Sequence, residues 1–181
     1  MKQTQFAFNK DYCKEHGGTL RVGKRKTLRP LATKRPIHLV LKSHRNPATG
    51  KRCSLFAPGN YALEKIIRDQ ASKYHVKVHR ISFVWSHIHM TMTFPSRAAY
   101  KSFIKSVTSF LIARLSKQHG VDLRGLFDVP PYTRVLSTRT EFLELMRYHD
   151  LNEQEALGLI RRQQKKPAQT RKGARKNAST S

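Results

Sequence analysis

The sequence predicts an α+β fold in which an antiparallel sheet carries helices packed on one face and leaves the other face open. Apolar residues alternate with polar ones in several short segments, which predicts strands, and recur at three- and four-residue steps in others, which predicts helices. These segments follow one another in the order strand, helix, strand, strand, helix, strand, helix. The 181 residues suffice for one compact domain with tails.

The first half of the expected domain contains two strands and a helix. Residues 35–43 alternate apolar and polar side chains, which predicts a strand that is partly buried on both faces. Residues 61–74 place apolar side chains at helical spacing and predict an amphipathic helix. Residues 76–85 are rich in β-branched and aromatic residues and predict the second strand.

The second half contains two further strands and two further helices. Residues 87–94 alternate as a third strand, and residues 97–118 carry apolar positions at helical steps. Residues 126–136 contain two consecutive prolines, so we expect an edge strand or a strand broken by a loop. A third helix is expected over residues 139–148.

The chain is strongly basic, and this favours a polyanionic partner. It holds 36 Lys and Arg against 11 Asp and Glu, a formal charge of +25, and nucleic acid is the expected partner. We expect a basic N-terminal arm at 1–35, a folded domain at 36–160 and a basic disordered tail at 161–181. The arm is either a flexible lead-in or a binding element. As a binding element it would contact the DNA backbone through Arg21, Lys24, Arg25, Lys26 and Arg29.

A membrane surface would also attract this charge, but the sequence does not indicate a membrane protein. No segment reaches the ~18 consecutive apolar residues of a spanning helix. The N-terminal residues, MKQTQFAFNKDY, lack the apolar core of a signal peptide. Cys13 and Cys53 form no paired motif, so we expect reduced thiols and a cytoplasmic location.

Two histidines in the third strand, His87 and His89, are candidate metal ligands. Side chains alternate along a strand, so both point to the face opposite the core, roughly 6–7 Å apart. Two imidazoles at this spacing can reach one cation. Two solvated surface side chains are the ordinary alternative, because a His-x-His pair also arises by chance in a histidine-rich chain.

The last helix supplies candidate partners for that pair. Tyr148 and Asn152 are four residues apart, at the margin of a stripe formed by Phe142, Leu145, Met146 and His149. A phenol at this margin can meet a substrate, and an amide oxygen suits Mg²⁺ or Mn²⁺. Amphipathic packing alone would also explain the tyrosine. The metal interpretation requires this helix to lie along the open face of the sheet.

These residues carry a resemblance to a known family. His87-Ile88-His89 on a strand, followed by a helical tyrosine with Asn four residues on, resembles the single-tyrosine HUH transposases of insertion-sequence type. The run YHDLNEQEALG at 148–158 and the segment at 17–43 are similar to their REP-associated branch. The resemblance spans residues 16–160, although Ser86 stands where many members have Asn.

The resemblance implies a ferredoxin-like fold and a specific activity. His87, His89 and Asn152 would bind a divalent metal, Mg²⁺ or Mn²⁺. Tyr148 would attack single-stranded or hairpin DNA, leaving a 5′-phosphotyrosine and a free 3′-hydroxyl. Trp85 is a candidate for base stacking, although a structural role is equally open. The protein would act near the bacterial nucleoid, as a monomer or homodimer.

Two other functions stay open at this level. The first is a non-catalytic nucleic-acid-binding protein that uses the same basic sheet. The second is a replication or relaxase-type nickase, which in some families has two neighbouring tyrosines. Tyr132 lies on a different element from Tyr148, and this disfavours the nickase.

Overall fold

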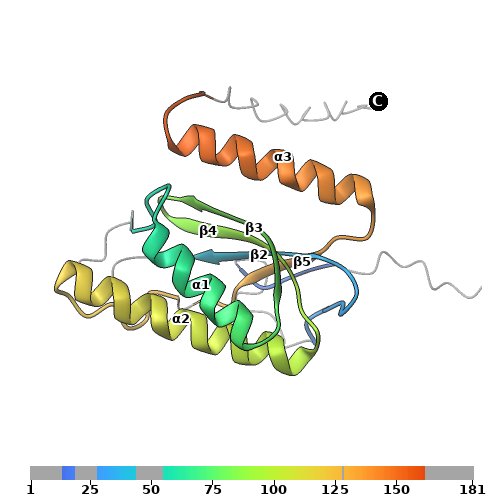
Figure 1. Cartoon of the computed structure of the whole chain (residues 1–181), viewed down its shortest axis with the longest axis horizontal. Coiled ribbons are helices and arrows are strands. Elements are labelled where there is room, and N and C mark those ends of the chain that lie inside the picture. Colours follow the sequence, from blue (N-terminus) through green and yellow to red (C-terminus); the bar gives the residue numbers. More distant parts are fainter. Residues whose placement is uncertain (1–13, 19–27, 44–54, 128, 162–181) are drawn as a thin grey trace, which may run out of the picture.

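The computed structural model describes residues 14–18, 28–43, 55–127 and 129–161, and these form one five-stranded antiparallel sheet with three helices (Figure 1). The strands lie in the order β1-β5-β2-β4-β3. Their bounds are Glu15–His16 for β1, Ile37–Lys42 for β2, Lys77–Val84 for β3, His87–Thr93 for β4 and Tyr132–Val135 for β5. The α+β class with an antiparallel sheet is confirmed.

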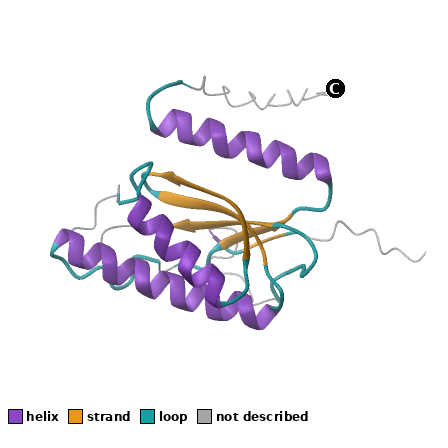
Figure 2. Cartoon of the chain, in the orientation of Figure 1, coloured by secondary structure: helices purple, strands orange, loops and turns teal. Residues whose placement is uncertain are grey.

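The helices lie on both faces of the sheet. Helices α1 (Tyr61–Lys73) and α2 (Arg97–His119) pack together on one face, whereas α3 (Arg139–Ala156) crosses the opposite face (Figures 1 and 2). The expectation of helices on one face therefore holds for α1 and α2 and is wrong for α3. The face expected to be open is covered along the length of this helix, which is where the metal interpretation required it to lie.

The hydrophobic core lies between the sheet and the pair α1 and α2. Strands β2 and β4 pair in the register Leu39↔Met90, so their apolar side chains point to the same face. The central buried residues of this layer are Ile37, Leu39, Leu41, Ile88, Met90, Met92, Leu63, Ile67, Phe103, Val107 and Leu111. One face of β4 is therefore apolar and buried in the core, and its other face carries His87 and His89.

Two element boundaries differ from the sequence prediction. Helix α3 continues to Ala156, two turns beyond the expected end at Tyr148. Strand β5 is not at the edge of the sheet, because it pairs with β2 on one side and β1 on the other. Its two prolines precede the first residue of the strand and so remove no hydrogen bond from the ladder.

Arg29 fastens the N-terminal segment to β5. Its Nη1 donates to the carbonyl oxygen of Pro131 at 2.8 Å, to the hydroxyl of Thr133 at 2.7 Å and to the carbonyl oxygen of His16 at 3.2 Å. The guanidinium also lies over the ring of Tyr100. Part of the expected basic arm is therefore built into the edge of the sheet.

Within the described ranges, no helix combines the length and the apolar character needed to cross a bilayer. Cys13, Cys53 and the tail from residue 162 onward lie outside these ranges.

The attachment of β1 to β5 depends on Gly17, and this generates a prediction. Gly17 has a φ of +84°, and an added Cβ would overlap the carbonyl oxygen of Pro131. Gly59 has a similar φ of +72° with nothing near its Cβ position. We expect Gly59→Ala to cost about 1 kcal/mol through backbone strain alone, and Gly17→Ala to cost roughly 1–3 kcal/mol more. Urea unfolding measures both. Equal losses of unfolding free energy for the two variants would contradict the close approach of Gly17 to the carbonyl oxygen of Pro131.

Candidate active site

The site lies on the polar face of the sheet, beneath α3. Val40 is paired with His89 across β2 and β4, and Ser82 is paired with His89 across β4 and β3. This register places one row of polar side chains under the helix. The buried polar residues of the layer are His38, Ser82, His89, Thr91, His149 and Asn152.

His87 and His89 lie side by side, as the sequence predicted for a single strand face. Their ring centroids are 4.5 Å apart and the rings are inclined at 75°. The Oγ of Ser86 is 3.0 Å from Nδ1 of His87. Serine therefore supports the first histidine at the position where many members of the family that the chain resembles have asparagine.

His89 is held by a third histidine. Its Nδ1 is 3.0 Å from Nε2 of His38, and the two rings stack with centroids 5.2 Å apart. His89 is only 4% exposed, and its Nε2 is buried with no hydrogen-bond partner among the described residues. This nitrogen is therefore a buried lone pair or N–H that receives no hydrogen bond from the part of the chain that the structure describes.

Burial keeps these imidazoles neutral near pH 7. Burial, followed by the neighbouring histidines, lowers the pKa of His89 to about 2. Burial, followed mainly by His149 and Arg134, lowers the pKa of His38 to about 3. Burial and then Lys42 also lower the pKa of His87. A neutral imidazole is the form that binds metal ions.

His149 joins α3 to the sheet. Its Nδ1 is 2.6 Å from the Oγ of Ser82 on β3, and its Nε2 is 2.9 Å from the Oγ1 of Thr91 on β4. The side chain is fully buried, and burial followed by Arg80 lowers its pKa to about 4. One neutral imidazole therefore connects the helix to two strands.

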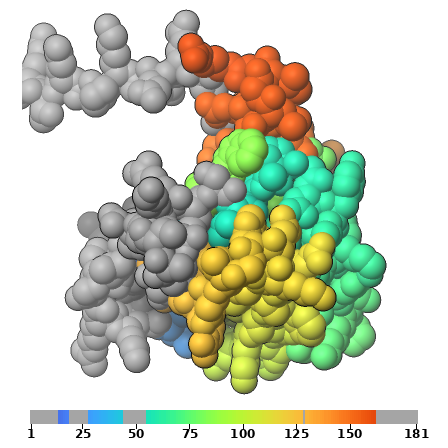
Figure 3. All heavy atoms as spheres, turned by 90° about the vertical axis from the view of Figure 1, so that its left-hand side faces the viewer, coloured from blue at the N-terminus to red at the C-terminus, as the bar shows by residue number. Residues whose placement is uncertain are grey.

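Further contacts fix α3 at its C-terminal half. Arg80 on β3 forms ion pairs of 2.8 Å with Asp150 and with Glu153. The Nε1 of Trp85 donates to the carbonyl oxygen of Ala156 at 3.0 Å. Figure 3 shows the turn between β3 and β4, in light green, directly below α3. Trp85 thus has a structural contact in addition to its exposed surface.

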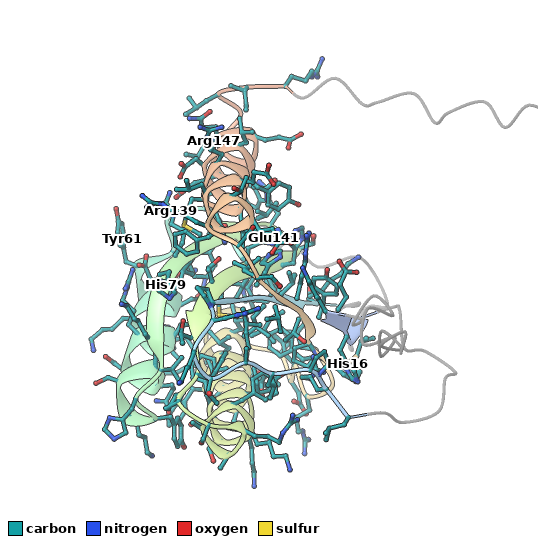
Figure 4. The ribbon with its side chains drawn as sticks, turned by 90° about the vertical axis from the view of Figure 1, so that its right-hand side faces the viewer. His16, Tyr61, His79, Arg139, Glu141 and Arg147 are labelled. Carbon is teal, nitrogen blue, oxygen red and sulfur yellow. The ribbon has the colours of Figure 1, made fainter. Side chains whose placement is uncertain are left out.

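The N-terminal half of α3 is fixed by a capping box. Thr138 accepts from the backbone N–H of Glu141, whose carboxylate accepts in return from the backbone N–H of Thr138. The same carboxylate lies 3.3 Å from Nζ of Lys14, beside β1. Figure 4 looks along the helix and shows Glu141 on one side, Arg139 and His79 on the other, and Arg147 pointing away from the sheet.

These contacts place Tyr148 beside the histidines. Its ring centroid is 5.5 Å from that of His89 and 6.4 Å from that of His38, with both pairs edge to face. The tyrosine is 39% exposed, so one part of it contacts the buried layer and another faces solvent. The structure brings the predicted nucleophile to the predicted metal ligand from a different element.

A pocket of about 430 Å³ opens next to this pair, on the Glu141 side of α3. It is lined by His38, Val40, His89, Tyr132, Arg134, Leu136, Glu141, Glu144, Leu145 and Tyr148. Its walls combine aromatic rings, aliphatic side chains, one arginine and two glutamates. Its volume lies within the range that is typical of small-ligand sites.

The side chains present fit a divalent cation. The described residues contain no cluster of three His, Cys, Asp or Glu side chains able to hold a metal ion. A third protein ligand would be a side chain of another kind, and the sequence predicts an amide for this position. Asn152 is buried on α3, one turn beyond Tyr148. Two neutral imidazoles, one with a buried nitrogen that the described residues leave unsatisfied, and an amide oxygen form a suitable donor set.

Of the five predicted phosphate contacts, the structure describes Arg29 alone. Arg21, Lys24, Arg25 and Lys26 lie outside the described residues. Arg29 is half-buried, and its Nη1 is engaged by β5 and β1. Arg29 therefore has a structural role in the fold, and its contact with DNA stays a prediction.

Sequence reasoning missed two residues that organise the site. His38 belongs to no motif, but it alternates with Ile37 and Leu39 and so had to face away from the core. His149 was assigned to the packing stripe of the helix, without a partner. A buried imidazole needs hydrogen bonds, which is the signal that could have identified its role.

Comparisons with known proteins find likeness among solved structures. No protein-family model matches the chain, and no curated protein matches it. Among solved structures it is similar to the crystal structure of a "putative transposase" from Deinococcus radiodurans R1, at a TM-score of 0.43 and 17% identity, over 71% of this chain and 98% of that chain. A likeness at this TM-score carries no functional argument.

The buried His149 predicts a pH-dependent contribution to stability. Its pKa is near 4 in the folded protein and about 6.5 when unfolded, so its contribution is complete above pH 6.5 and is lost as the pH falls toward 4. We expect His149→Gln to lower the free energy of unfolding by about 1–3 kcal/mol at pH 7 and by less at pH 4.5.

Urea unfolding in EDTA at the two pH values measures this difference, because EDTA removes any metal-linked stabilisation. The matched control is His119→Gln, at the exposed end of α2, for which we expect a change within about 0.5 kcal/mol. A loss for His149→Gln that is equal at both pH values would contradict a neutral, buried imidazole.

Proposed function

We propose that this chain is a metal-dependent single-tyrosine DNA strand transferase that cleaves single-stranded or hairpin DNA. One observation carries the proposal: the ring of Tyr148 on α3 lies 5.5 Å from the ring of His89 on β4, although the two residues belong to separate elements. The resemblance of the His87-Ile88-His89 and Tyr148–Asn152 motifs to single-tyrosine HUH transposases supports it.

The reaction transfers the phosphoryl group at the cleavage site from the 3′-oxygen of the DNA to the tyrosine. The Tyr148 phenol oxygen forms a bond to the scissile phosphorus as the bond from phosphorus to the 3′-oxygen breaks. The phenol loses its proton and the 3′-oxygen gains one, so the products are a 5′-phosphotyrosine and a free 3′-hydroxyl. Because the phosphodiester energy is kept in the covalent link, a second 3′-hydroxyl can reverse the step and join a new strand.

The residues around Tyr148 have separate parts in this step. His87, His89 and Asn152 would hold a divalent ion, Mg²⁺ or Mn²⁺, which when bound polarises a phosphoryl oxygen and offsets the charge that develops on it. Helix α3, fixed by His149 and Arg80, keeps the phenol directed at that phosphate. Orientation of this kind lowers the barrier without a further catalytic group.

The DNA strand would approach along the pocket between α3 and β5. Tyr132 and Tyr148 offer faces for base stacking, and Arg134 offers a positive charge for the backbone. The net charge of +25 would supply the long-range attraction for a phosphate chain. We extend the proposal to REP-type hairpins as substrates and to the bacterial cytoplasm as the location, with one or two subunits per active complex.

Removal of the phenol oxygen tests the nucleophile. Tyr148→Phe is expected to abolish the covalent adduct with a labelled hairpin oligonucleotide, because no oxygen remains to bond phosphorus. Hairpin binding should stay within about threefold, since the ring and its contacts persist. A denaturing gel in Mn²⁺ measures the adduct.

The matched control is Tyr61→Phe at the first residue of α1, where the side chain is 83% exposed. This variant should form the adduct at the wild-type level. Adduct formation by Tyr148→Phe would show another nucleophile, and binding without any adduct from the wild type would favour the non-catalytic nucleic-acid-binding protein.

Removal of the metal or its ligands tests the cation. His87→Ala and His89→Ala are each expected to reduce cleavage by roughly 100-fold or more, as is EDTA with the wild-type protein, because the charge on the phosphate is no longer offset. Restored cleavage on adding excess Mn²⁺ to EDTA-treated wild type is the control. Cleavage that persists in EDTA would identify a metal-free nuclease.

A further inference from the structure

The hydrogen bond between His38 and His89 restricts where protons lie in the site. His38 is buried on β2, and its Nε2 is 3.0 Å from Nδ1 of His89, with the two rings nearly parallel at 16°. A neutral imidazole carries one proton, on one of its two ring nitrogens. One of the two facing nitrogens must donate and the other must accept.

Only two proton arrangements satisfy this contact. In the first, Nδ1–H of His89 donates to His38, and Nε2 of His89 is a bare lone pair. In the second, Nε2–H of His38 donates to His89, and Nε2 of His89 carries a proton. This buried N–H would then have no acceptor among the described residues, which costs free energy. A bare lone pair in the same place is able to accept a cation.

We propose that His38 is a positioning residue that accepts the Nδ1–H of His89 and so holds the Nε2 lone pair of His89 toward the metal site. The metal part of this inference rests on the proposed function. His38 does not itself bind the ion, because in this arrangement its Nε2 accepts from His89 and its Nδ1 carries the single proton of the ring. The neighbouring Ser86 has a related contact with Nδ1 of His87, so both imidazoles of the pair are held through the same nitrogen.

Support of this type matters because a histidine ring has two tautomers and can rotate about its side-chain bond. A hydrogen bond to the non-ligating nitrogen selects one tautomer and fixes the plane of the ring. Partners in this position are commonly carboxylates or carbonyl oxygens. Here the partner is a neutral imidazole, which adds no negative charge beside the DNA phosphate.

Two variants separate the hydrogen bond from simple packing. His38→Phe keeps a ring in contact with Tyr132 and Tyr148 but removes the acceptor. His38→Gln supplies an amide oxygen that can accept from His89. His79→Phe is the matched control, since His79 bonds Thr93 and packs on Phe142, on the far side of α3.

The first measurement needs no variant and no metal. Nitrogen-15 NMR of the imidazoles in metal-free wild-type protein at pH 7 assigns the proton of each ring. We expect His89 to be protonated at Nδ1 and His38 to be unprotonated at Nε2. A His89 proton on Nε2 would overturn the proposal.

The second measurement is the affinity for Mn²⁺ alone, from the electron paramagnetic resonance signal of the free ion. His38→Phe is expected to weaken binding roughly 10–100-fold, whereas His38→Gln should recover most of that loss and His79→Phe should match the wild type. Wild-type affinity in His38→Phe would overturn the proposal, as would equal losses in His38→Phe and His38→Gln.

The outcomes distinguish this inference from the proposed function. A protein that binds Mn²⁺ in a His38-dependent manner but forms no DNA adduct would sustain the role of His38 and contradict the strand transferase. Wild-type protein that does not bind Mn²⁺ would overturn the role of His38 as well as the metal site.

Discussion

The hydrogen bonds of one buried imidazole, His149, determine how the rest of the site is arranged. They join α3 to β3 through Ser82 and to β4 through Thr91. Because Tyr148 is the preceding residue, the same contacts set the position of the phenol. A helix packed only by apolar contacts can rotate or slide by small amounts, whereas two directional bonds of 2.6 and 2.9 Å allow little of either.

The two faces of the sheet are therefore held by different forces. The face toward α1 and α2 is an apolar core, stabilised by removal of its side chains from water. The face toward α3 is a layer of histidines and hydroxyl groups, in which every buried polar atom needs a partner. Replacing both partners of a hydrogen bond in that layer by apolar side chains of the same shape would often leave the stability unchanged or raise it. A buried polar layer of this kind lowers the stability that the fold could reach, and such local losses of stability are typical of functional sites.

The sequence predicted much of the fold because most elements have strong local patterns, as in β4, where core and histidine faces alternate residue by residue. It missed the interior position of β5, since β1 consists of only two residues, Glu15–His16, and such a strand has no periodicity. The sequence also did not predict the contact of His38 with His89 or the attachment of Arg29 to β5. Both depend on pairing between distant segments, which one sequence does not reveal. The histidine pair and Tyr148 were predictable because they belong to spaced motifs.

The central proposal is that His87, His89 and Asn152 hold one divalent ion beside the Tyr148 phenol. A crystal structure of the protein with Mn²⁺, with the metal located by its anomalous scattering, tests this claim most directly. The account predicts one strong anomalous peak bonded to ring nitrogens of His87 and His89 and to the side-chain oxygen of Asn152, with the Tyr148 hydroxyl beside it. A peak bonded to other residues, or α3 turned so that Tyr148 faces away from His89, would contradict it.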